Sequence, residues 1–248
     1  MLIVNGDDWG RSEAETNAAL DCHERGTVTS VSAMVFMKDS DRAAGIAKIA
    51  GVDVGLHLNL TEEFTSEETP AQLRQAHRRI ARFLRRNKYA FLLYHPGLRK
   101  EFWSVYGAQA DEFRRLYGVD PSHLDGHLHM HHCTNMMIDR IIPKGQRVRR
   151  NFSFWPGEKG VVNRTYRGLA DLWLGRRYKL SDYFFSLESC LKAGTLSRVM
   201  ELAKTAIVEL MTHPVYPLEH GFLTGEICKS LMERMPKGSR VRSYPLLD

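Results

Sequence analysis

Two adjacent aspartates, Asp7 and Asp8, follow a short apolar segment near the start of the chain, residues 2–5. Two carboxylates beside a buried strand repel each other unless a positive group neutralises them. A divalent metal does this, and neighbouring side chains at a strand end can diverge, so that one binds the metal while the other faces a substrate. The alternative is a solvated turn or the cap of the following helix. The pair is therefore a first candidate for metal or acid–base chemistry.

A second candidate lies in the segment 55–61, where His57 and Asn59 alternate with leucines. Such alternation is typical of a strand with one apolar and one polar face. A histidine on the polar face either accepts and donates hydrogen bonds in the core or serves as a metal ligand.

The third candidate is the histidine-rich segment 122–132, which contains His123, His127, His129 and His131. These four histidines share one parity, so an extended chain would project them to the same side. Imidazole is the commonest metal ligand, and this density favours metal binding, with some of the rings structural or supporting the ligands. A structural zinc site is the alternative, but such sites usually have four cysteine or histidine ligands, and no suitably paired cysteine is present.

One carboxylate and two histidines form the ligand set of hydrolytic metal sites that keep positions open for water and substrate. The metal lowers the pKa of a bound water and polarises a carbonyl. The spare carboxylate, Asp7, can act as general base, and His213 can protonate a leaving amine. These parts favour amide hydrolysis. A metal-dependent phosphoesterase is the alternative, in which His129 and His131 would supply ligands for a second metal. A non-catalytic binding module would require Asp7 or His213 to be missing, and both are present.

Strand and helix signals alternate in the first third of the chain, which favours a mainly parallel α/β sheet. Strands are predicted over residues 2–5, 28–37, 52–58, 123–125, 147–149 and 207–212. Helices are predicted over residues 13–25, 41–50, 71–86, 98–117, 135–142, 196–204 and 225–234. The aromatic and basic segment 152–189 gives no clear element. The candidate residues fall at or just beyond the ends of predicted strands, where the loops of a parallel barrel converge on one face.

Length and composition favour one globular domain over residues 1–248. The sequence is 43% hydrophobic and 26% charged, which excludes a disordered or fibrous chain. Its four cysteines lie far apart, so a disulfide framework is not expected, and a reduced cytoplasmic location is the simplest interpretation. The N-terminal apolar run is too short for a signal peptide.

Residues 71–88 form a basic amphipathic segment with no acidic residue. Its cations are Arg74, Arg78, Arg79, Arg82, Arg85, Arg86 and Lys88. One interpretation is a solvated helix face. The other is a peripheral surface for anionic membrane lipid, or for a lipid-linked or phosphorylated sugar. A nucleic-acid partner is not expected, because no recognised binding motif accompanies the charge.

Five ordered segments resemble the motifs of the YdjC-like (ChbG/HpnK) carbohydrate deacetylase family: IVNGDDWG, TVTSVSAMV, VGLHLNLT, SHLDGHLHMH and ELMTHP. The resemblance spans essentially the whole chain. It implies an irregular (β/α) barrel related to the NodB-type polysaccharide deacetylases, one divalent metal ion (Mg²⁺ or Zn²⁺), a homodimer, and removal of N-acetyl groups from amino sugars.

The resemblance also implies individual roles. Asp8, His57 and His127 match the metal ligands of the family, and Asp7 matches its catalytic acid/base. His213 matches the histidine of a late motif. Arg149 stands where an arginine often orients the catalytic carboxylate, with Arg147 and Arg150 as alternatives. The region after Thr61 and the segment 152–189 depart from the pattern expected of chitooligosaccharide enzymes. The substrate, whether a free oligosaccharide or a lipid- or nucleotide-linked sugar, therefore stays open.

Overall fold

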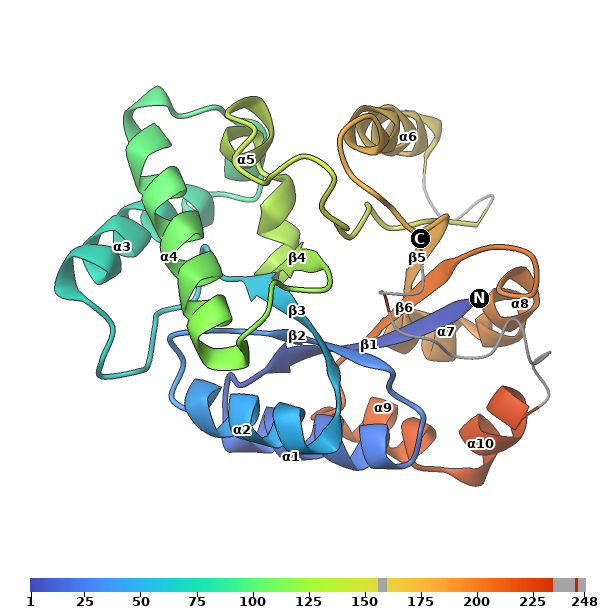
Figure 1. The fold of residues 1–248 in the computed structure, drawn as a ribbon. Coiled ribbons are helices and arrows are strands. Elements are labelled where there is room, and N and C mark those ends of the chain that lie inside the picture. Colours follow the sequence, from blue (N-terminus) through green and yellow to red (C-terminus); the bar gives the residue numbers. More distant parts are fainter. Residues whose placement is uncertain (156–159, 234–243, 245–248) are drawn as a thin grey trace. The chain divides into compact units, whose positions relative to one another are not determined.

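The computed structural model describes residues 1–155, 160–233 and 244. Six strands form a sheet in the order β4-β3-β2-β1-β6-β5 (Figure 1). Strand β6 pairs in parallel with both β1 and β5, and β3 pairs in parallel with β4. Helices follow most of these strands along the chain, as expected of parallel pairs, which need crossover connections. The predicted α/β class with a parallel sheet is confirmed.

Two compact units are distinguished along the chain. Unit 1 comprises residues 1–7, 17–31 and 145–248, and unit 2 comprises residues 8–16 and 32–144. The strands β1 (Leu2–Trp9) and β2 (Ser30–Ala33) contribute residues to both. The single domain predicted over residues 1–248 stays a prediction.

Unit 1 is built around β1 and β6, whose register places Leu2 opposite Val208 and Gly6 opposite Thr212. All eight residues of β1 are buried, including its polar ones. The other elements of this unit are α1 (Glu13–Glu24, from Asn17 onward), α6 (Val161–Gly175), β5 (Tyr183–Ser186), α7 (Leu187–Ala193), α8 (Leu196–Leu202), β6 (Val208–Thr212), α9 (Pro217–Leu223) and α10 (Glu226–Glu233).

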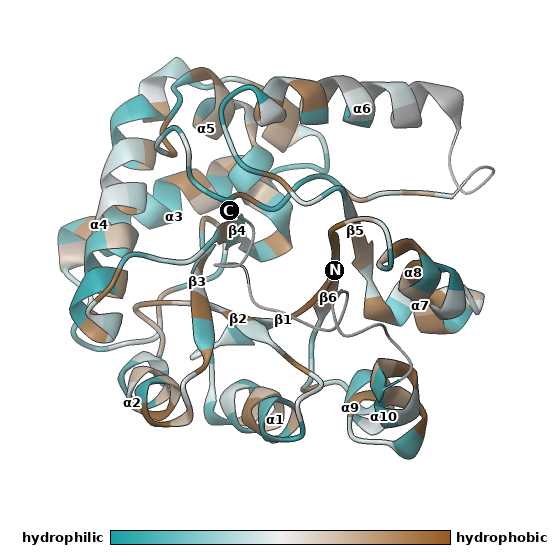
Figure 2. Cartoon of the chain, turned by 45° about the vertical axis from the view of Figure 1, so that its right-hand side comes forward, coloured by the Kyte–Doolittle hydropathy of each residue, from teal (hydrophilic) through white to brown (hydrophobic). Residues whose placement is uncertain are grey.

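Unit 2 holds the helix pair α3 and α4, which pack against each other. Helix α3 buries Leu73, Ile80 and Leu84 at helical spacing and leaves its arginines on the other side. Figure 2 shows the resulting alternation of hydrophilic and hydrophobic segments along α3. The elements of this unit are α2 (Ser40–Ala50), β3 (Asp53–Leu58), α3 (Ala71–Arg85), η1 (Ala90–Leu92), η2 (Pro96–Leu98), α4 (Arg99–Tyr117), β4 (Leu124–Gly126), η3 (His127–His132) and α5 (Thr134–Ile138).

Most predicted elements are present within one or two residues of their expected bounds. Four differ more. The strand expected over 2–5 continues to Trp9, so that Asp7 and Asp8 lie within it. The strand expected over 28–37 is reduced to β2, the helix over 135–142 ends at Ile138, and the strand over 147–149 is only an isolated bridge between Arg147 and Lys179. The last residue of the helix expected over 225–234 lies outside the described residues. No element was predicted in the segment 152–189, whereas the structure has α6, β5 and the start of α7 there.

The expectation of an extended histidine segment is wrong. Strand β4 ends at Gly126, and the chain turns at once into η3. Leu128 and His129 have positive φ angles of 53° and 59°, which break the two-residue alternation of an extended chain. The side chains of His129 and His131 therefore do not form one row with that of His127.

None of the helices in the described part of the chain is both long and apolar enough to cross a membrane.

Candidate metal centre

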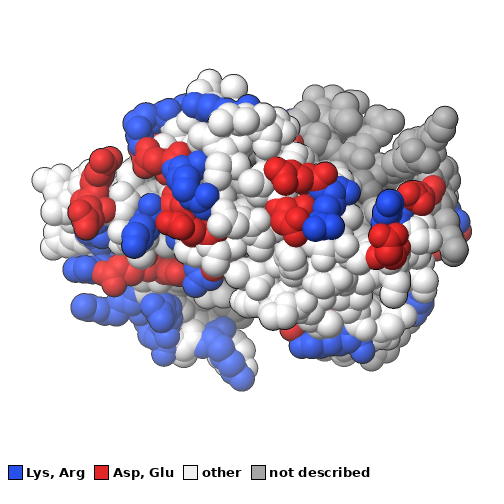
Figure 3. Space-filling view, turned by 90° about the horizontal axis from the view of Figure 1, so that it is seen from below, with Lys and Arg blue, Asp and Glu red and all other residues white. Residues whose placement is uncertain are grey.

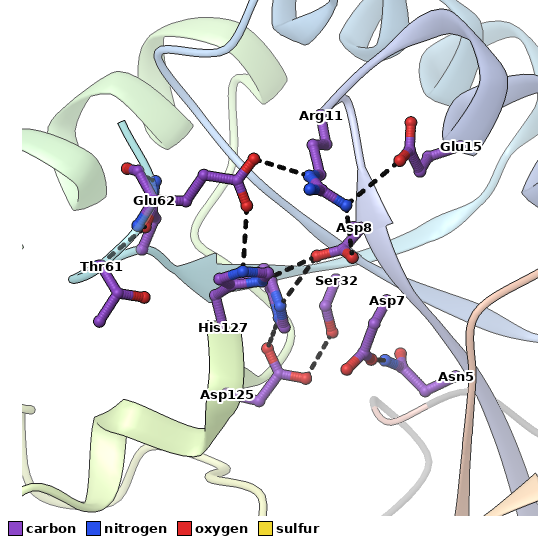
Figure 4. Close-up of polar contacts among 12 residues, drawn as sticks. Asn5, Asp7, Asp8, Arg11, Glu15, Ser32, Thr61, Glu62, Asp125 and His127 are labelled. Carbon is purple, nitrogen blue, oxygen red and sulfur yellow. Dashed lines mark hydrogen bonds and ion pairs between the residues drawn. The ribbon is translucent and has the colours of Figure 1, made fainter. Parts of the chain in front are cut away.

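Unit 2 brings together Asp8, His57 and His127, the residues expected to bind a metal. One donor atom from each lies within 4.8 Å of the others. Asp8 Oδ1 is 3.3 Å from His57 Nε2 and 3.1 Å from His127 Nδ1. The side chains of Asp8 and His57 are only 5% and 2% exposed, so this carboxylate and imidazole meet away from bulk water (Figure 4).

Local backbone geometry sets these side chains in place. Asp8 lies within β1 but has a φ of 67°, a left-handed conformation that aspartate tolerates better than most residues. Such strain persists only where the surroundings enforce it, and it is concentrated at functional sites. His127 follows β4 directly, at the turn into η3. That turn needs Gly126, because a Cβ there would lie 2.9 Å from the backbone nitrogen of His131.

A buried carboxylate orients His57. Its Nδ1 is 2.8 Å from Asp125 Oδ1, and the second oxygen of Asp125 accepts a hydrogen bond of 2.7 Å from Ser32 Oγ. Because the carboxylate engages Nδ1, the ring is held with Nε2 directed at Asp8. Ligating histidines in metalloproteins are held in this way by an outer carboxylate.

A second carboxylate meets His127 from the other side. Glu62 Oε2 is 3.0 Å from His127 Nε2, and Glu62 Oε1 accepts a bond of 2.9 Å from Arg11 Nε. Burial opposes a charge on both Asp8 and His127, but their mutual contacts outweigh it. Hydrogen bonds from His127 and His57 hold the pKa of Asp8 far below its usual range, and those to Asp8 and Glu62 raise the pKa of His127.

The donor set fits a divalent cation. It offers one carboxylate and two imidazoles, which suit zinc and other first-row metals and leave coordination positions open. Closed structural zinc sites use four cysteine or histidine ligands, and His129 and His131 are not among the converging donors of the described residues. The described residues therefore do not place His129 and His131 where a phosphoesterase would need them as ligands of a second metal.

Unit 1 holds the residues predicted to act as base and as its orienting partner. Both oxygens of Asp7 accept hydrogen bonds of 2.7 Å from the two terminal nitrogens of Arg149. Asn5 Nδ2 donates to Asp7 Oδ1 at 2.9 Å, and Arg149 Nε donates to Glu209 Oε1 at 2.5 Å. Arg149 is fully buried. Of Arg147, Arg149 and Arg150, it is the arginine that contacts Asp7 in the described part of the chain. Arg150 instead pairs with Asp171.

His213 follows the last residue of β6 and is half-buried. Its backbone nitrogen donates to Glu219 Oε2 at 3.0 Å, and its ring centroid lies 5.5 Å from that of Tyr216. Burial raises the pKa of Glu219. The catalytic role of His213 stays a prediction.

Sequence reasoning missed the carboxylates that support the two histidines. Asp125 carried a usable signal, because it stands between His123 and His127 at the same parity and within a predicted strand. Glu62 carried a weak one, since it follows the predicted strand 52–58 by four residues, in a loop whose course the pattern does not reveal.

A sequence model of the YdjC-like protein family matches residues 1–242 of this chain. A carbohydrate deacetylase of Xenopus laevis is 24% identical over 87% of this chain and 81% of its own length. A carbohydrate deacetylase of Halalkalibacterium halodurans is 28% identical over 87% of this chain and 85% of its own length. A chitooligosaccharide deacetylase of Proteus mirabilis is 32% identical, but over 58% of this chain and 53% of its own length.

A solved structure has a similar fold. It is that of a candidate cellobiose-phosphate cleavage protein of Enterococcus faecalis, with a TM-score of 0.67 and 18% identity over 98% of this chain and 97% of that one. Because the family model matches nearly the whole sequence, this chain belongs to the YdjC-like family.

Proposed function

We propose that this protein is a metal-dependent hydrolase that removes the N-acetyl group from an amino sugar. The observation that carries the proposal is the convergence of Asp8, His57 and His127 in a chain of this family. The names of the relatives, carbohydrate deacetylase and chitooligosaccharide deacetylase, support an N-acetylated carbohydrate as the substrate class.

Asp8, His57 and His127 would hold one divalent ion. Such an ion supplies Lewis acidity, which activates water and polarises a carbonyl. Asp125 and Glu62 hold the two imidazoles in fixed orientations through contacts of 2.8 and 3.0 Å. Such outer carboxylates fix the tautomer and orientation of an imidazole and strengthen it as a ligand.

Asp7 would serve as the general base. An ionised carboxylate offers about four lone-pair positions. Arg149 occupies two of them and Asn5 a third within the described residues, so about one remains to accept a proton. The bidentate guanidinium fixes the plane of the carboxylate and so the direction of that lone pair.

His213 would serve as the general acid. An amide differs from an ester because its leaving nitrogen must be protonated before it departs, and an imidazolium can supply this proton near neutral pH. Tyr216 lies beside the ring and can limit its movement.

The test is acetate release from a panel of N-acetylated sugars: chitooligosaccharides, nucleotide-linked sugars and lipid-linked sugars. Acetate release that stops on chelation and returns with Zn²⁺ or Mg²⁺ supports the proposal. His57→Ala and His127→Ala should abolish it, whereas His220→Ala, at a half-exposed histidine that pairs with Asp21, should not. Acetate release from none of the sugars, or phosphate release from phosphoesters instead, would overturn the proposal.

A further inference from the structure

A hollow of about 520 Å³ lies along helix α3 in unit 2. Four of its lining residues are arginines: Arg78, Arg82, Arg85 and Arg86. Their spacing places them on one side of the helix, opposite the buried stripe that packs toward α4. Lys and Arg side chains gather at the lower left of Figure 3, on the side of the molecule where Figure 1 shows α3. Like charges at this spacing slightly destabilise a helix, and a bound anion would offset this effect.

Most of this positive charge has no acidic partner. Glu63 lines the same hollow and pairs with Arg78 through a contact of 2.5 Å between Arg78 Nη2 and Glu63 Oε1. Arg82, Arg85 and Arg86 form no ion pair with the residues that the structure describes. Three uncompensated guanidinium groups therefore border one cavity. A planar guanidinium binds phosphate oxygens in pairs, which makes arginine a strong phosphate ligand.

The wall of the hollow is neutral and polar. His77 is 1% exposed and stacks on Phe64 with ring centroids 4.3 Å apart. Burial lowers the pKa of His77 to about 4, so its ring is uncharged at neutral pH. The hydroxyl of Thr61 and Nε2 of His77 have no hydrogen-bond partner among the described residues. These two polar atoms are thus available to form hydrogen bonds with a ligand.

The hollow begins next to the candidate metal centre. Thr61 lines it, and the following residue, Glu62, contacts His127 at 3.0 Å. Successive Cα atoms are about 3.8 Å apart. From Arg78 to Arg86 the helix extends about 12 Å, which is long enough for more than one phosphate group.

We propose that this hollow binds the diphosphate group of an N-acetylated amino sugar that is linked through diphosphate to a nucleotide or a lipid. The inference rests on the proposed deacetylase function and names its substrate class. Arg82, Arg85 and Arg86 spread their guanidinium groups over about 6 Å of helix, which suits two linked phosphate groups better than one. Because Thr61 borders the hollow and directly precedes Glu62, which contacts His127, we place the anion on the sugar that reacts.

Binding is tested first with inorganic pyrophosphate and inorganic phosphate, by isothermal titration calorimetry. Wild-type protein should bind pyrophosphate more tightly than phosphate. The double variant R82Q/R85Q should weaken pyrophosphate binding by about tenfold or more, as expected for the loss of charge-assisted contacts. The control is R79Q, which removes one charge from the same helix at a residue that pairs with Glu101 and does not line the hollow. Equal affinity for the two anions, or equal binding by R82Q/R85Q and wild type, would overturn the proposal.

Activity is tested on three substrates: a nucleotide-diphospho-N-acetyl sugar, a lipid-diphospho-N-acetyl sugar in neutral vesicles, and a free N-acetylated chitooligosaccharide. R82Q/R85Q should raise KM for one or both diphosphate substrates by about tenfold and leave the free oligosaccharide unchanged. The affected substrate distinguishes a nucleotide from a lipid source. An equal effect on all three substrates would overturn the subsite but not the deacetylase. Pyrophosphate binding that depends on Arg82 and Arg85, without acetate release from any sugar, would overturn the deacetylase function instead.

Discussion

Replacing Asp125 by asparagine tests whether the carboxylate behind His57 supports a metal ion. Asparagine keeps the shape of the side chain. Its carbonyl oxygen can still accept the hydrogen bond of His57 Nδ1, which lies 2.8 Å from Asp125 Oδ1 in the wild-type protein. Its amide group then faces Ser32 Oγ, which is 2.7 Å from the present carboxylate and can accept in turn. The fold should therefore persist, while the negative charge that makes His57 a stronger ligand is lost.

Loss of such an outer carboxylate typically lowers metal affinity by about 10- to 100-fold, which is about 1.4–2.7 kcal/mol. Competition of the protein with a chromophoric chelator for Zn²⁺ measures the dissociation constant directly, and circular dichroism checks the fold. The control is Asp39→Asn, another buried aspartate of unit 2, which pairs with Arg42 on α2. A zinc affinity of the Asp125→Asn variant within about threefold of wild type would refute the reasoning, because an orienting carboxylate must affect ligand strength.

Three further predictions concern Asp7 and Asp8, His213 and His77. Asp8→Asn should lower metal content in elemental analysis, whereas Asp7→Asn should keep the metal and lose about 10²–10⁴ in turnover; the reverse pattern would exchange their roles. His213→Ala should lose most activity on amides but little on an activated ester, and equal losses would contradict a proton-donating role. Because burial lowers the pKa of His77 from 6.5 to about 4, the unfolded chain binds a proton between these values that the folded chain does not. Stability should therefore fall by up to about 3 kcal/mol as pH drops from 6.5 to 4, and urea unfolding of His77→Phe should lack this decrease.

The strands that carry the site could be predicted because their signals are local. The apolar run before Asp7 and the leucine alternation around His57 each identify a strand, and both histidines of the candidate metal centre lie at strand ends. The family resemblance then supplied the ligand set. Helices α3 and α4 were likewise predicted within one residue at either end, because each has a continuous apolar stripe over several turns.

Other features depend on tertiary contacts that no local pattern records. The turn at Leu128 and His129 requires positive φ angles in two non-glycine residues, which propensity disfavours. The partner of Glu62 is a histidine 65 positions later in the sequence, and that of Asp7 is an arginine 142 positions later. Strand β5 alternates poorly, because Phe184 and Phe185 are both buried, and such a short run cannot be distinguished from a helix segment by periodicity.

The two adjacent aspartates show why their roles should differ. Asp7 pairs with the guanidinium of Arg149. A guanidinium is always protonated in proteins and has no lone pair to offer a metal. Asp8 instead meets two imidazoles, which can be neutral and are then good metal ligands. Around those imidazoles, the described residues place one guanidinium, that of Arg11, beside the carboxylates of Asp8, Asp125 and Glu62, so that the carboxylates outnumber it by two. A divalent cation would offset this excess at Asp8, whereas the carboxylates of Asp7 and Glu209 exceed the charge of Arg149 by only one. On this ground we propose that the metal binds at Asp8 and that Asp7 is the base.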